Sequence, residues 1–453
     1  MSGKELAIRM VMADANGQIF DHPELLMLCR HGRQWCLPRP DEVIPLPKES
    51  ELFLLPGRHA VGLDEHGNTQ VTEHLAVAAF LAPAHTISAH PCYESDDKAP
   101  LLPLFAYAAV GFAHGRFYVC AKKVDNDPRQ QFAHIPRSRI EHHAAELTKR
   151  YPANRLVQHI INNCVARYDC PAARNFALGR FEAPLPSSRT CNARCLACIS
   201  KQEETSPIAV TPQCRLTFTP KATEIAQVME IHAAREKARP IFSFGQGCEG
   251  DPLQNAELLA ESIALYRQSN GSGTINVNTN GSRPEVLEAL AKTGLTSIRV
   301  SLNSARKDLY TCYYRPQGYT FDHVQQSLGI ARRLGLFISL NLLFFPGISD
   351  TEEELSALSD LVGENGVSMI QWRNLNIDPE WYLDCLAQGP GLPATSGMGL
   401  TTFMKRLKRL CPWLVYGYFN PWLGETAKLT APEPGTWQKP ETALTNKEPK
   451  EIS

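Results

Sequence analysis

Cys191, Cys195 and Cys198 stand in Cys-x3-Cys-x2-Cys spacing within one short segment of the chain. Three thiolates on a short loop can bind three of the four irons of a cubane iron–sulfur cluster. The fourth iron then has no protein ligand, so it can bind a small molecule and take part in chemistry on it. The spacing therefore indicates an open iron–sulfur site, whereas four cysteines would form a closed site suited to electron transfer.

Two other interpretations of the triplet stay open. The three residues could be core thiols, because the chain has 14 cysteines. They could also ligate zinc together with a fourth partner. Zinc sites usually use a second Cys-x2-Cys pair, and no such pair follows in this sequence. The motifs that follow favour the iron–sulfur interpretation.

Three motifs follow the cysteines in order. They are Ser-Phe-Gly-Gln-Gly-Cys-Glu-Gly-Asp-Pro-Leu at 243–253, the strand-like Ile-Asn-Val-Asn-Thr-Asn-Gly at 275–281, and the strand-like Ser-Ile-Arg-Val-Ser-Leu-Asn at 297–303. Together with the triplet, their spacing and character resemble the radical S-adenosylmethionine (SAM) superfamily over about residues 180–380.

The resemblance implies an enzyme with two cofactors, a [4Fe-4S] cluster and SAM. It implies that Cys191, Cys195 and Cys198 bind the cluster as its catalytic ligands, and that the open iron chelates the methionine end of SAM. An electron from a reductant such as ferredoxin or flavodoxin would cleave SAM to a 5′-deoxyadenosyl radical. That radical would abstract hydrogen from a substrate, while the protein orients the reactants and excludes water.

Gly250 and Asp251 lie in a segment that resembles the Gly-Glu-Pro-Leu segment of the family, which holds the SAM amino group. A glycine lets backbone approach a ligand closely, and a carboxylate matches an ammonium. Asp251 is one methylene shorter than the usual glutamate, and Glu249 competes for the same role. The alternative is a turn in which Asp251 caps a helix.

Ser301 and Asn303 end a predicted strand, in a position that resembles family residues in contact with the SAM ribose or carboxylate. Asn341 matches a polar residue often found near the ribose, and in so apolar a strand it must find a partner if buried. Each could instead be an ordinary strand-end group with a partner in the protein. Arg373 could bind a carboxylate of the substrate or SAM, or form a structural ion pair.

One residue departs from the family pattern. Ala197 stands immediately before the third cysteine, where the family usually has an aromatic residue. The change removes an expected side-chain contact near the adenine without affecting cluster ligation. Together with Asp251, it leaves open a second hypothesis, a non-enzymatic iron–sulfur or zinc binding module that kept the barrel fold.

Other cysteines could have functions of their own. Cys164 and Cys170 lie just before the predicted sheet, and Cys29 and Cys36 lie further upstream, so some of them could hold an auxiliary cluster. Cys248 lies in the same motif as Asp251 and could donate hydrogen or bind substrate. The alternative for each is a small buried thiol.

Residues from 183 onward alternate apolar strands with amphipathic helices, which predicts an α/β fold with a parallel sheet buried on both faces. We expect a first strand just before Cys191, then strands at 240–244, 274–279, 297–302, 337–343 and 368–373, with helices at 223–237, 256–268, 284–292, 321–334 and 351–362. About six such units fit a partial (β/α)6 barrel of the radical SAM type. The motifs should then share the rim at the carboxyl ends of the strands.

The pattern of apolar, proline and charged residues divides the chain into four predicted parts. Residues 1–180 form an accessory domain, β-rich or α+β, with proline-broken strands at 26–63 and helices at 138–167. Residues 181–380 form the core, and 381–426 add a helix and strand that pack on it. Residues 427–453 are expected to be a disordered tail.

Charge and hydropathy restrict the partners. The chain has 453 residues and a formal net charge of −1, which does not favour a nucleic-acid partner. The start lacks an apolar run, and the apolar stretches at 75–84 and 101–113 are too short to cross a bilayer. We therefore expect a cytoplasmic protein without a membrane partner. The substrate stays open among a protein, a peptide and a small metabolite.

Overall fold

The structure is a computed structural model that describes residues 7–204, 206–208, 210–424 and 436–437. The tail predicted at 427–453 therefore lies outside the described residues, apart from 436–437. In the described part of the chain, no helix is both long and apolar enough to cross a membrane.

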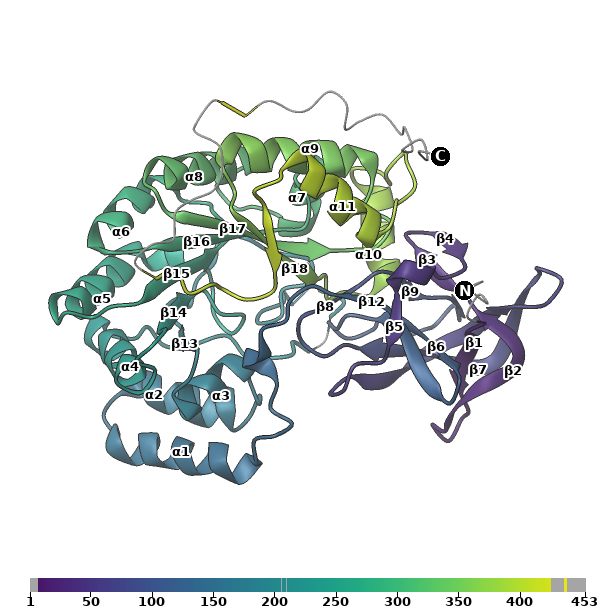
Figure 1. The fold of residues 1–453 in the computed structure, drawn as a ribbon, viewed down its shortest axis with the longest axis horizontal. Helices are drawn as coiled ribbons and strands as arrows, with labels where there is room; N and C mark the ends of the chain where they lie inside the picture. The colour runs from purple at the N-terminus through teal and green to yellow at the C-terminus, as the bar shows by residue number, and fades with distance from the viewer. Residues whose placement is uncertain (1–6, 205, 209, 425–435, 438–453) are drawn as a thin grey trace, which may run out of the picture.

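Residues 182–417 form an α/β unit around one parallel sheet (Figure 1). Its strands lie in chain order: β13 (Glu182–Leu185), β14 (Ile241–Phe244), β15 (Thr274–Thr279), β16 (Ser297–Leu302), β17 (Phe337–Phe344), β18 (Met369–Asn374) and β19 (Val415–Gly417). Every neighbouring pair is parallel. The predicted α/β class with a parallel sheet is confirmed.

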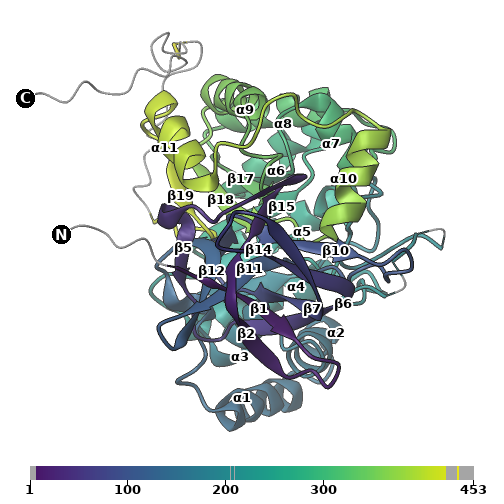
Figure 2. The same cartoon turned by 90° about the vertical axis from the view of Figure 1, so that its right-hand side faces the viewer.

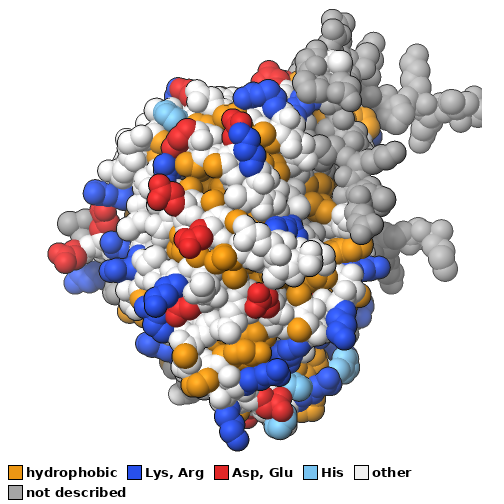
Figure 3. Space-filling model, turned by 90° about the vertical axis from the view of Figure 1, so that its left-hand side faces the viewer, with side chains coloured by type: hydrophobic (Ala, Val, Ile, Leu, Met, Phe, Trp, Pro, Cys, Tyr) orange, Lys and Arg blue, Asp and Glu red, His pale blue; other side chains and the backbone are white. Residues whose placement is uncertain are grey.

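Helices connect these strands and cover the outer side of the curved sheet (Figure 1). They are α4 (Ala222–Arg235), α5 (Ala256–Gln268), α6 (Leu287–Thr293), α7 (Lys307–Tyr314), α8 (Phe321–Arg333), α9 (Glu352–Asn365), α10 (Pro379–Gln388) and α11 (Leu400–Leu410). Two differ from expectation, because the sequence pattern did not predict α7 or α10. On the outer face of the unit, cationic and anionic side chains are interspersed (Figure 3), as is usual for the solvated side of amphipathic helices.

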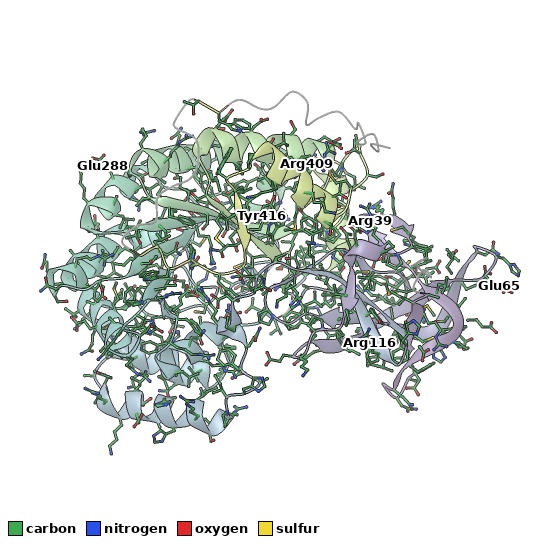
Figure 4. The ribbon with its side chains drawn as sticks, in the orientation of Figure 1. Arg39, Glu65, Arg116, Glu288, Arg409 and Tyr416 are labelled. Atoms are coloured by element: carbon green, nitrogen blue, oxygen red, sulfur yellow. The ribbon has the colours of Figure 1, made fainter. Side chains whose placement is uncertain are left out.

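The strand β19 makes the parallel sheet one strand larger than the six predicted. It lies within the predicted 381–426 segment, and it pairs with β18 to add a seventh strand to the sheet. Tyr416 on β19 packs its ring against Trp372 and donates from its hydroxyl to the Met404 carbonyl on α11 (Figure 4). The C-terminal segment therefore completes one end of the sheet.

The N-terminal part of the chain is built from antiparallel strands. They are β1 (Arg9–Ala13), β2 (Ile19–Met27), β3 (Cys29–His31), β4 (Gln34–Cys36), β5 (Val43–Pro45), β6 (Glu51–Leu63), β7 (Thr69–Phe80), β8 (His85–Ile87), β9 (His90–Pro91), β10 (Tyr93–Ser95), β11 (Ala108–Ala113) and β12 (Arg116–Lys123). Nine form one sheet, and β4, β3 and β9 form a small second sheet. The helices α1 (Arg137–Arg150), α2 (Arg155–His159) and α3 (Pro171–Leu178) then lead to β13.

A buried ion pair joins the two halves. Arg58 on β6 donates to Asp378 at 2.7 Å, and both side chains are almost fully buried. Asp378 also caps α10 and accepts from the backbone of Leu102. Arg39 lies where the N-terminal strands meet the segment before α11 (Figure 4), and it donates to the Gly397 carbonyl. Figure 2 shows the N-terminal strands in front of the parallel sheet.

Polar residues line one face of the parallel sheet at alternate positions. The register pairs Arg299 with Ser339 and Ser301 with Asn341. Asn341 in turn pairs with Gln371 on β18. Because side chains alternate between the faces of a strand, these residues share the inner, helix-free face.

Candidate active site

The three cysteines lie on the loop that follows β13, and α7 holds that loop in place. The backbone N–H of Leu196 donates to the Tyr313 carbonyl at 2.9 Å. That of Arg194 donates to the Tyr314 carbonyl at 3.0 Å. An isolated antiparallel bridge joins Ala193 to Pro316 just beyond the helix. The cysteine loop is therefore fixed to the sheet rim by α7, a helix that was not among those predicted.

Hydrogen bonds also join the cysteine loop to the segment after β14. Gly250 donates from its N–H to the Ser188 carbonyl at 2.7 Å, and Asp251 donates to the Thr190 carbonyl at 2.9 Å. The side chain of Asn192, next to Cys191, bonds to Asn280 after β15 at 2.9 Å. The loops after three neighbouring strands thus meet, as expected from their positions at the carboxyl ends of parallel strands.

Glu249 uses its carboxylate to bind backbone. One oxygen accepts from the N–H groups of Ser187 and Ser188 and from the Ser187 hydroxyl. The other accepts from the N–H groups of Gly245 and Gln246 at 2.8 Å each. Burial raises the pKa of Glu249 to about 7 against the opposing effect of these donors. With five donors bound, the side chain shapes the loops and has little capacity left for a ligand.

Asp251 is also satisfied by the protein. Its carboxylate accepts from the N–H of Leu253, which caps the short helix Pro252–Asn255. It accepts from the Thr279 hydroxyl at 2.9 Å and from the N–H of Asn280 at 2.7 Å. Burial raises its pKa to about 6. The helix-capping alternative therefore describes the geometry of Asp251, which connects the ends of β14 and β15.

Ser301 and Asn341 are hydrogen-bonded to each other, whereas Asn303 has other partners. Asn341 donates to the Ser301 hydroxyl at 3.2 Å across the β16–β17 register, and both side chains are half-buried. Asn303 donates to the Leu309 carbonyl at 3.1 Å and to the Tyr382 hydroxyl at 3.2 Å. Its buried side-chain oxygen has no hydrogen-bond partner among the described residues, so this acceptor is available to a ligand.

The thiols lie in an environment that disfavours free thiolates. Burial, followed by the charge of Asp251, raises the pKa of Cys191 to about 11. Burial also raises the pKa of Cys195 well above its ordinary value. A bound metal would remove this penalty, because a coordinating thiol is deprotonated.

The donor set fits a cluster better than a single ion. Among the described residues, only Cys29, His31 and Cys36 have ligand atoms all within 4.8 Å of one another. The triplet at Cys191, Cys195 and Cys198 does not converge in this way. Ligands of a cubane bind different irons, so their sulfurs lie further apart than those on one zinc ion.

Sequence reasoning missed several residues around the cysteines. Arg215 donates to the Cys198 sulfur, with 3.4 Å between Nη2 and Sγ. Tyr310, Tyr313, Tyr314 and Tyr319 are buried near Cys195, and burial raises the pKa of each of their hydroxyls. The i, i+3, i+4 spacing of the first three was a signal for one buried helix face. No local pattern marked Arg215.

Two arginines project from the inner face of the sheet. Arg299 donates to the Gln371 side chain at 2.7 Å, and Arg373 donates to the Tyr418 carbonyl at 2.7 Å. Burial, together with the charge of Arg373, lowers the pKa of Arg299 to about 9. Among the described residues, neither guanidinium has a carboxylate within ion-pair distance, and each has an Nε atom without a partner. The pair is therefore suited to an anionic ligand.

A cavity of about 570 Å³ lies beside the cysteine loop. Its lining includes Thr190, which adjoins Cys191, and three cationic residues, Arg189, Lys201 and Arg215. The buried thiols of Cys164 and Cys248 lie close together, with His159 and Cys170 nearby. The structure thus gathers Cys164, Cys170 and Cys248, while Cys29 and Cys36 lie together in the N-terminal part of the chain.

Residues 185–358 match the sequence model of the radical SAM superfamily. The chain contains a radical SAM domain. The matched residues begin at the end of β13, include all three cysteines, and end within α9. Members of the superfamily are enzymes that bind a [4Fe-4S] cluster and SAM.

No curated protein matches the chain, but solved structures of radical SAM proteins do. The methyltransferase TsrM from Kitasatospora setae is 18% identical, with 44% of this chain and 36% of that chain covered and a TM-score of 0.32. SuiB from Streptococcus suis, bound to its precursor peptide SuiA, is 14% identical, with coverages of 48% and 43% and a TM-score of 0.33. HydG, a maturase of the [FeFe]-hydrogenase, is 16% identical, with coverages of 60% and 64% and a TM-score of 0.34. The match therefore spans little more than a third of TsrM.

Proposed function

We propose that this protein is a radical SAM enzyme whose [4Fe-4S] cluster is bound by Cys191, Cys195 and Cys198. The observation that supports it is the set of hydrogen bonds joining the cysteine loop to Gly250 and Asp251 at the rim of a parallel sheet. That rim lies within the matched domain and is where ligands bind in α/β folds.

When bound, the cluster and SAM supply a 5′-deoxyadenosyl radical that abstracts hydrogen from the substrate. The chain's own contribution is to hold these groups. Arg215 donates a hydrogen bond from its cationic group to the Cys198 sulfur. The tyrosines of α7 belong to the buried core against which Cys195 packs. SAM would lie over Gly250 and Asp251 and against Ser301, Asn303 and Asn341, whose polar groups face the same rim.

The proposal includes the division of the chain. Residues 1–180 act as an accessory domain, and residues 181–380 form the core, whose strands curve as a partial barrel. Residues 381–426 contribute α11 and β19, which pack on that core. The support is the buried Arg58–Asp378 pair, which fixes the N-terminal strands against the loop after β18.

The substrate carries an anionic group in this proposal. Arg299 and Arg373 provide two guanidinium groups on the inner face. By register, Arg299 lies one step deeper than Ser301 and Asn341, and Arg373 lies one step nearer the carboxyl ends of the strands. A protein, a peptide or a small metabolite with a carboxylate or phosphate would satisfy them. The electron would come from a reductant such as ferredoxin or flavodoxin.

The second candidate is a non-enzymatic iron–sulfur or zinc module. It is favoured by Asp251, whose carboxylate is already bound by Leu253, Thr279 and Asn280. Addition of SAM to the reduced protein separates the two functions. An enzyme binds SAM at the open iron and its EPR spectrum changes, whereas a binding module with a closed site leaves the spectrum unaltered.

The deciding experiment is SAM cleavage by anaerobically reconstituted protein. Wild-type protein with a full cluster should form 5′-deoxyadenosine from SAM when dithionite is added, measured by liquid chromatography and mass spectrometry. The variant with Cys191, Cys195 and Cys198 all changed to Ala should form none. Wild-type protein that carries the cluster and yields no 5′-deoxyadenosine, with or without cell extract, would contradict the proposal.

A further inference from the structure

Three ligand-type side chains converge in the N-terminal part of the chain, outside the residues that match the radical SAM model. Cys29, His31 and Cys36 each offer one ligand atom, and these atoms all lie within 4.8 Å of one another. The sulfurs of Cys29 and Cys36 are 3.7 Å apart. This convergence occurs in a hairpin of only eight residues.

The hairpin geometry accounts for the convergence. The strands β3 and β4 are antiparallel, and their register places Cys29 directly opposite Cys36. Cys29 and His31 are two positions apart on one strand, so their side chains point to the same face. Gly32 begins the turn with a positive φ of 58°, which suits glycine. The three side chains therefore share one face of a tight hairpin.

The site is buried and contains an unsatisfied polar atom. Cys29 is 0% exposed and His31 is 6% exposed. The Nδ1 atom of His31 has no hydrogen-bond partner among the described residues. A buried imidazole nitrogen without a partner is costly, so a ligand that fills this position would stabilise the fold. Because two thiols lie beside this nitrogen, a metal ion is the ligand that best satisfies all three groups.

We propose that Cys29, His31 and Cys36 bind a structural Zn²⁺ ion. A Zn–S bond of about 2.3 Å in tetrahedral geometry places two thiolates about 3.8 Å apart, which matches the 3.7 Å between the two sulfurs. Imidazole and thiolate are also the ligands that zinc prefers. Cys120 on β12 belongs to the same buried cluster as Cys29 and is the candidate for the fourth position, which its sulfur would reach by moving inward from outside the 4.8 Å group.

An iron–sulfur cluster, the other metal centre that cysteines commonly bind, fits this site less well than zinc. In a cubane cluster each cysteine binds a different iron, so the ligand sulfurs must be spread around the cluster. At Cys29 and Cys36 the sulfurs are instead close enough to share one ion. The site is therefore distinct from the open cluster site on the loop after β13.

The position of the hairpin gives the ion a structural role. Gly32 donates from its N–H to the Pro346 carbonyl at 2.9 Å, just after β17. His90, on the strand that pairs with β3, packs its ring against Phe345 at 4.5 Å. The hairpin thus contacts the loop that follows β17, at the rim of the radical SAM domain. A bound zinc would hold the hairpin rigid against that rim.

Metal analysis of the purified full-length protein tests the proposal. The variant with Cys191, Cys195 and Cys198 changed to Ala serves as the host, because it removes the iron–sulfur cluster. It should contain about one zinc per chain, and adding Cys29→Ser and Cys36→Ser should abolish that zinc. The matched control changes Cys312 and Cys385, a pair of partly buried cysteines elsewhere in the chain, to Ser; it should keep the zinc.

Cobalt substitution tests metal binding by spectroscopy in the host, which keeps both hairpin cysteines. The host reconstituted with Co²⁺ should show the thiolate charge-transfer and visible d–d bands of a tetrahedral site, and His31→Ala should weaken and shift them. A host that takes up neither zinc nor cobalt would overturn the proposal. A Cys29–Cys36 disulfide found by mass spectrometry in anaerobically purified protein would also overturn it.

Discussion

The guanidinium of Arg215 donates to the sulfur of Cys198, with 3.4 Å between Nη2 and Sγ. The same side chain donates from Nε to the Ser200 hydroxyl at 3.2 Å, and that hydroxyl bonds to the Glu249 carbonyl. Arg215 is therefore oriented by a chain of contacts that begins at the loop after β14. Hydrogen bonds to ligand sulfurs and nearby positive charge both raise the reduction potential of a cluster.

Replacing Arg215 should make the cluster harder to reduce. Arg215→Met removes a cationic donor from Cys198, so the reduction potential should become more negative in an EPR-monitored redox titration. Arg189→Met is the control, because Arg189 lines the same cavity as Arg215 and has no hydrogen bond to a cluster ligand among the described contacts. Equal potentials for the wild type and Arg215→Met would contradict a role in tuning the cluster.

Gly250 should not tolerate a side chain. A Cβ at this position would lie 2.0 Å from the Thr190 carbonyl oxygen, which is backbone and cannot rotate away. Gly250→Ala must therefore push the cysteine loop outward, at a cost of about 1–3 kcal/mol in the free energy of unfolding. We also expect a lower iron and sulfide content after reconstitution.

A helical glycine provides the matched control for Gly250. A Cβ on Gly329 in α8 would have its nearest neighbour at 3.7 Å, an ordinary contact. Gly329→Ala should therefore keep the cluster and should stabilise the protein by up to about 1 kcal/mol. Denaturant unfolding of the apoproteins, with iron and sulfide assays after reconstitution, measures both effects. Normal cluster content in Gly250→Ala would refute the argument.

Replacing Asn341 or Asn303 with Ala should have different effects on the free energy of unfolding. Asn341→Ala removes a side chain bonded only to Ser301 in the described contacts, so SAM affinity should fall about tenfold while stability changes little. Asn303→Ala should weaken SAM binding and also lower the free energy of unfolding by about 1–3 kcal/mol, because Asn303 holds Leu309 and Tyr382. Equilibrium dialysis and denaturant titration measure the two quantities. Unchanged SAM affinity in both variants would remove these residues from the SAM site.

Much of the site could be predicted because its signals are local. The cysteine spacing and the apolar strands at 274–279 and 297–302 are contiguous patterns, and the rim position follows from parallel strand topology. The triplet and the segment around Asp251 were expected on one rim, and the Asp251–Thr190 hydrogen bond joins their loops.

The rest depends on tertiary contacts that leave no local pattern. Arg215 reaches Cys198 from 17 positions further along the chain, and β19, with only three residues, gave no sign that it would join the parallel sheet. In the N-terminal sheet, β6 and β10 pair Ala60 with Tyr93, and β6 and β7 pair with register shifts. Strands with shifted registers do not keep a period-2 pattern, so sequence alone could not define their order.

The arginine pair should bind small anions. Arg299 and Arg373 have no carboxylate partner among the described residues, so sulfate should raise the melting temperature of the wild type by binding the folded state. The double variant Arg299→Met and Arg373→Met should lose most of that increase. Arg409→Met, on the exposed face of α11 (Figure 4), is the control and should respond as the wild type. Equal sulfate responses in the wild type and the double variant would contradict the anion site.

Glu249 should make the stability of the apoprotein depend on pH. Burial raises its folded-state pKa from 4.5 to about 7, so the folded state binds the proton more tightly than the unfolded state. Its stabilising contribution is therefore complete below about pH 4.5, falls as the pH rises, and is lost above about pH 7. Glu249→Gln cannot titrate, so its melting temperature should fall less than that of the wild type over this range.

This pH experiment requires a control substitution at an exposed glutamate and a host protein without the cluster. The host is again the variant with Cys191, Cys195 and Cys198 changed to Ala, since acid would otherwise release the iron. Glu65→Gln is the control, because that side chain is 88% exposed in an N-terminal turn (Figure 4) and should leave the pH profile unchanged. Melting curves recorded between about pH 4.5 and 8 give the slopes. Parallel profiles for the host and Glu249→Gln would show that the Glu249 carboxylate titrates as an ordinary exposed group, despite the five donors around it.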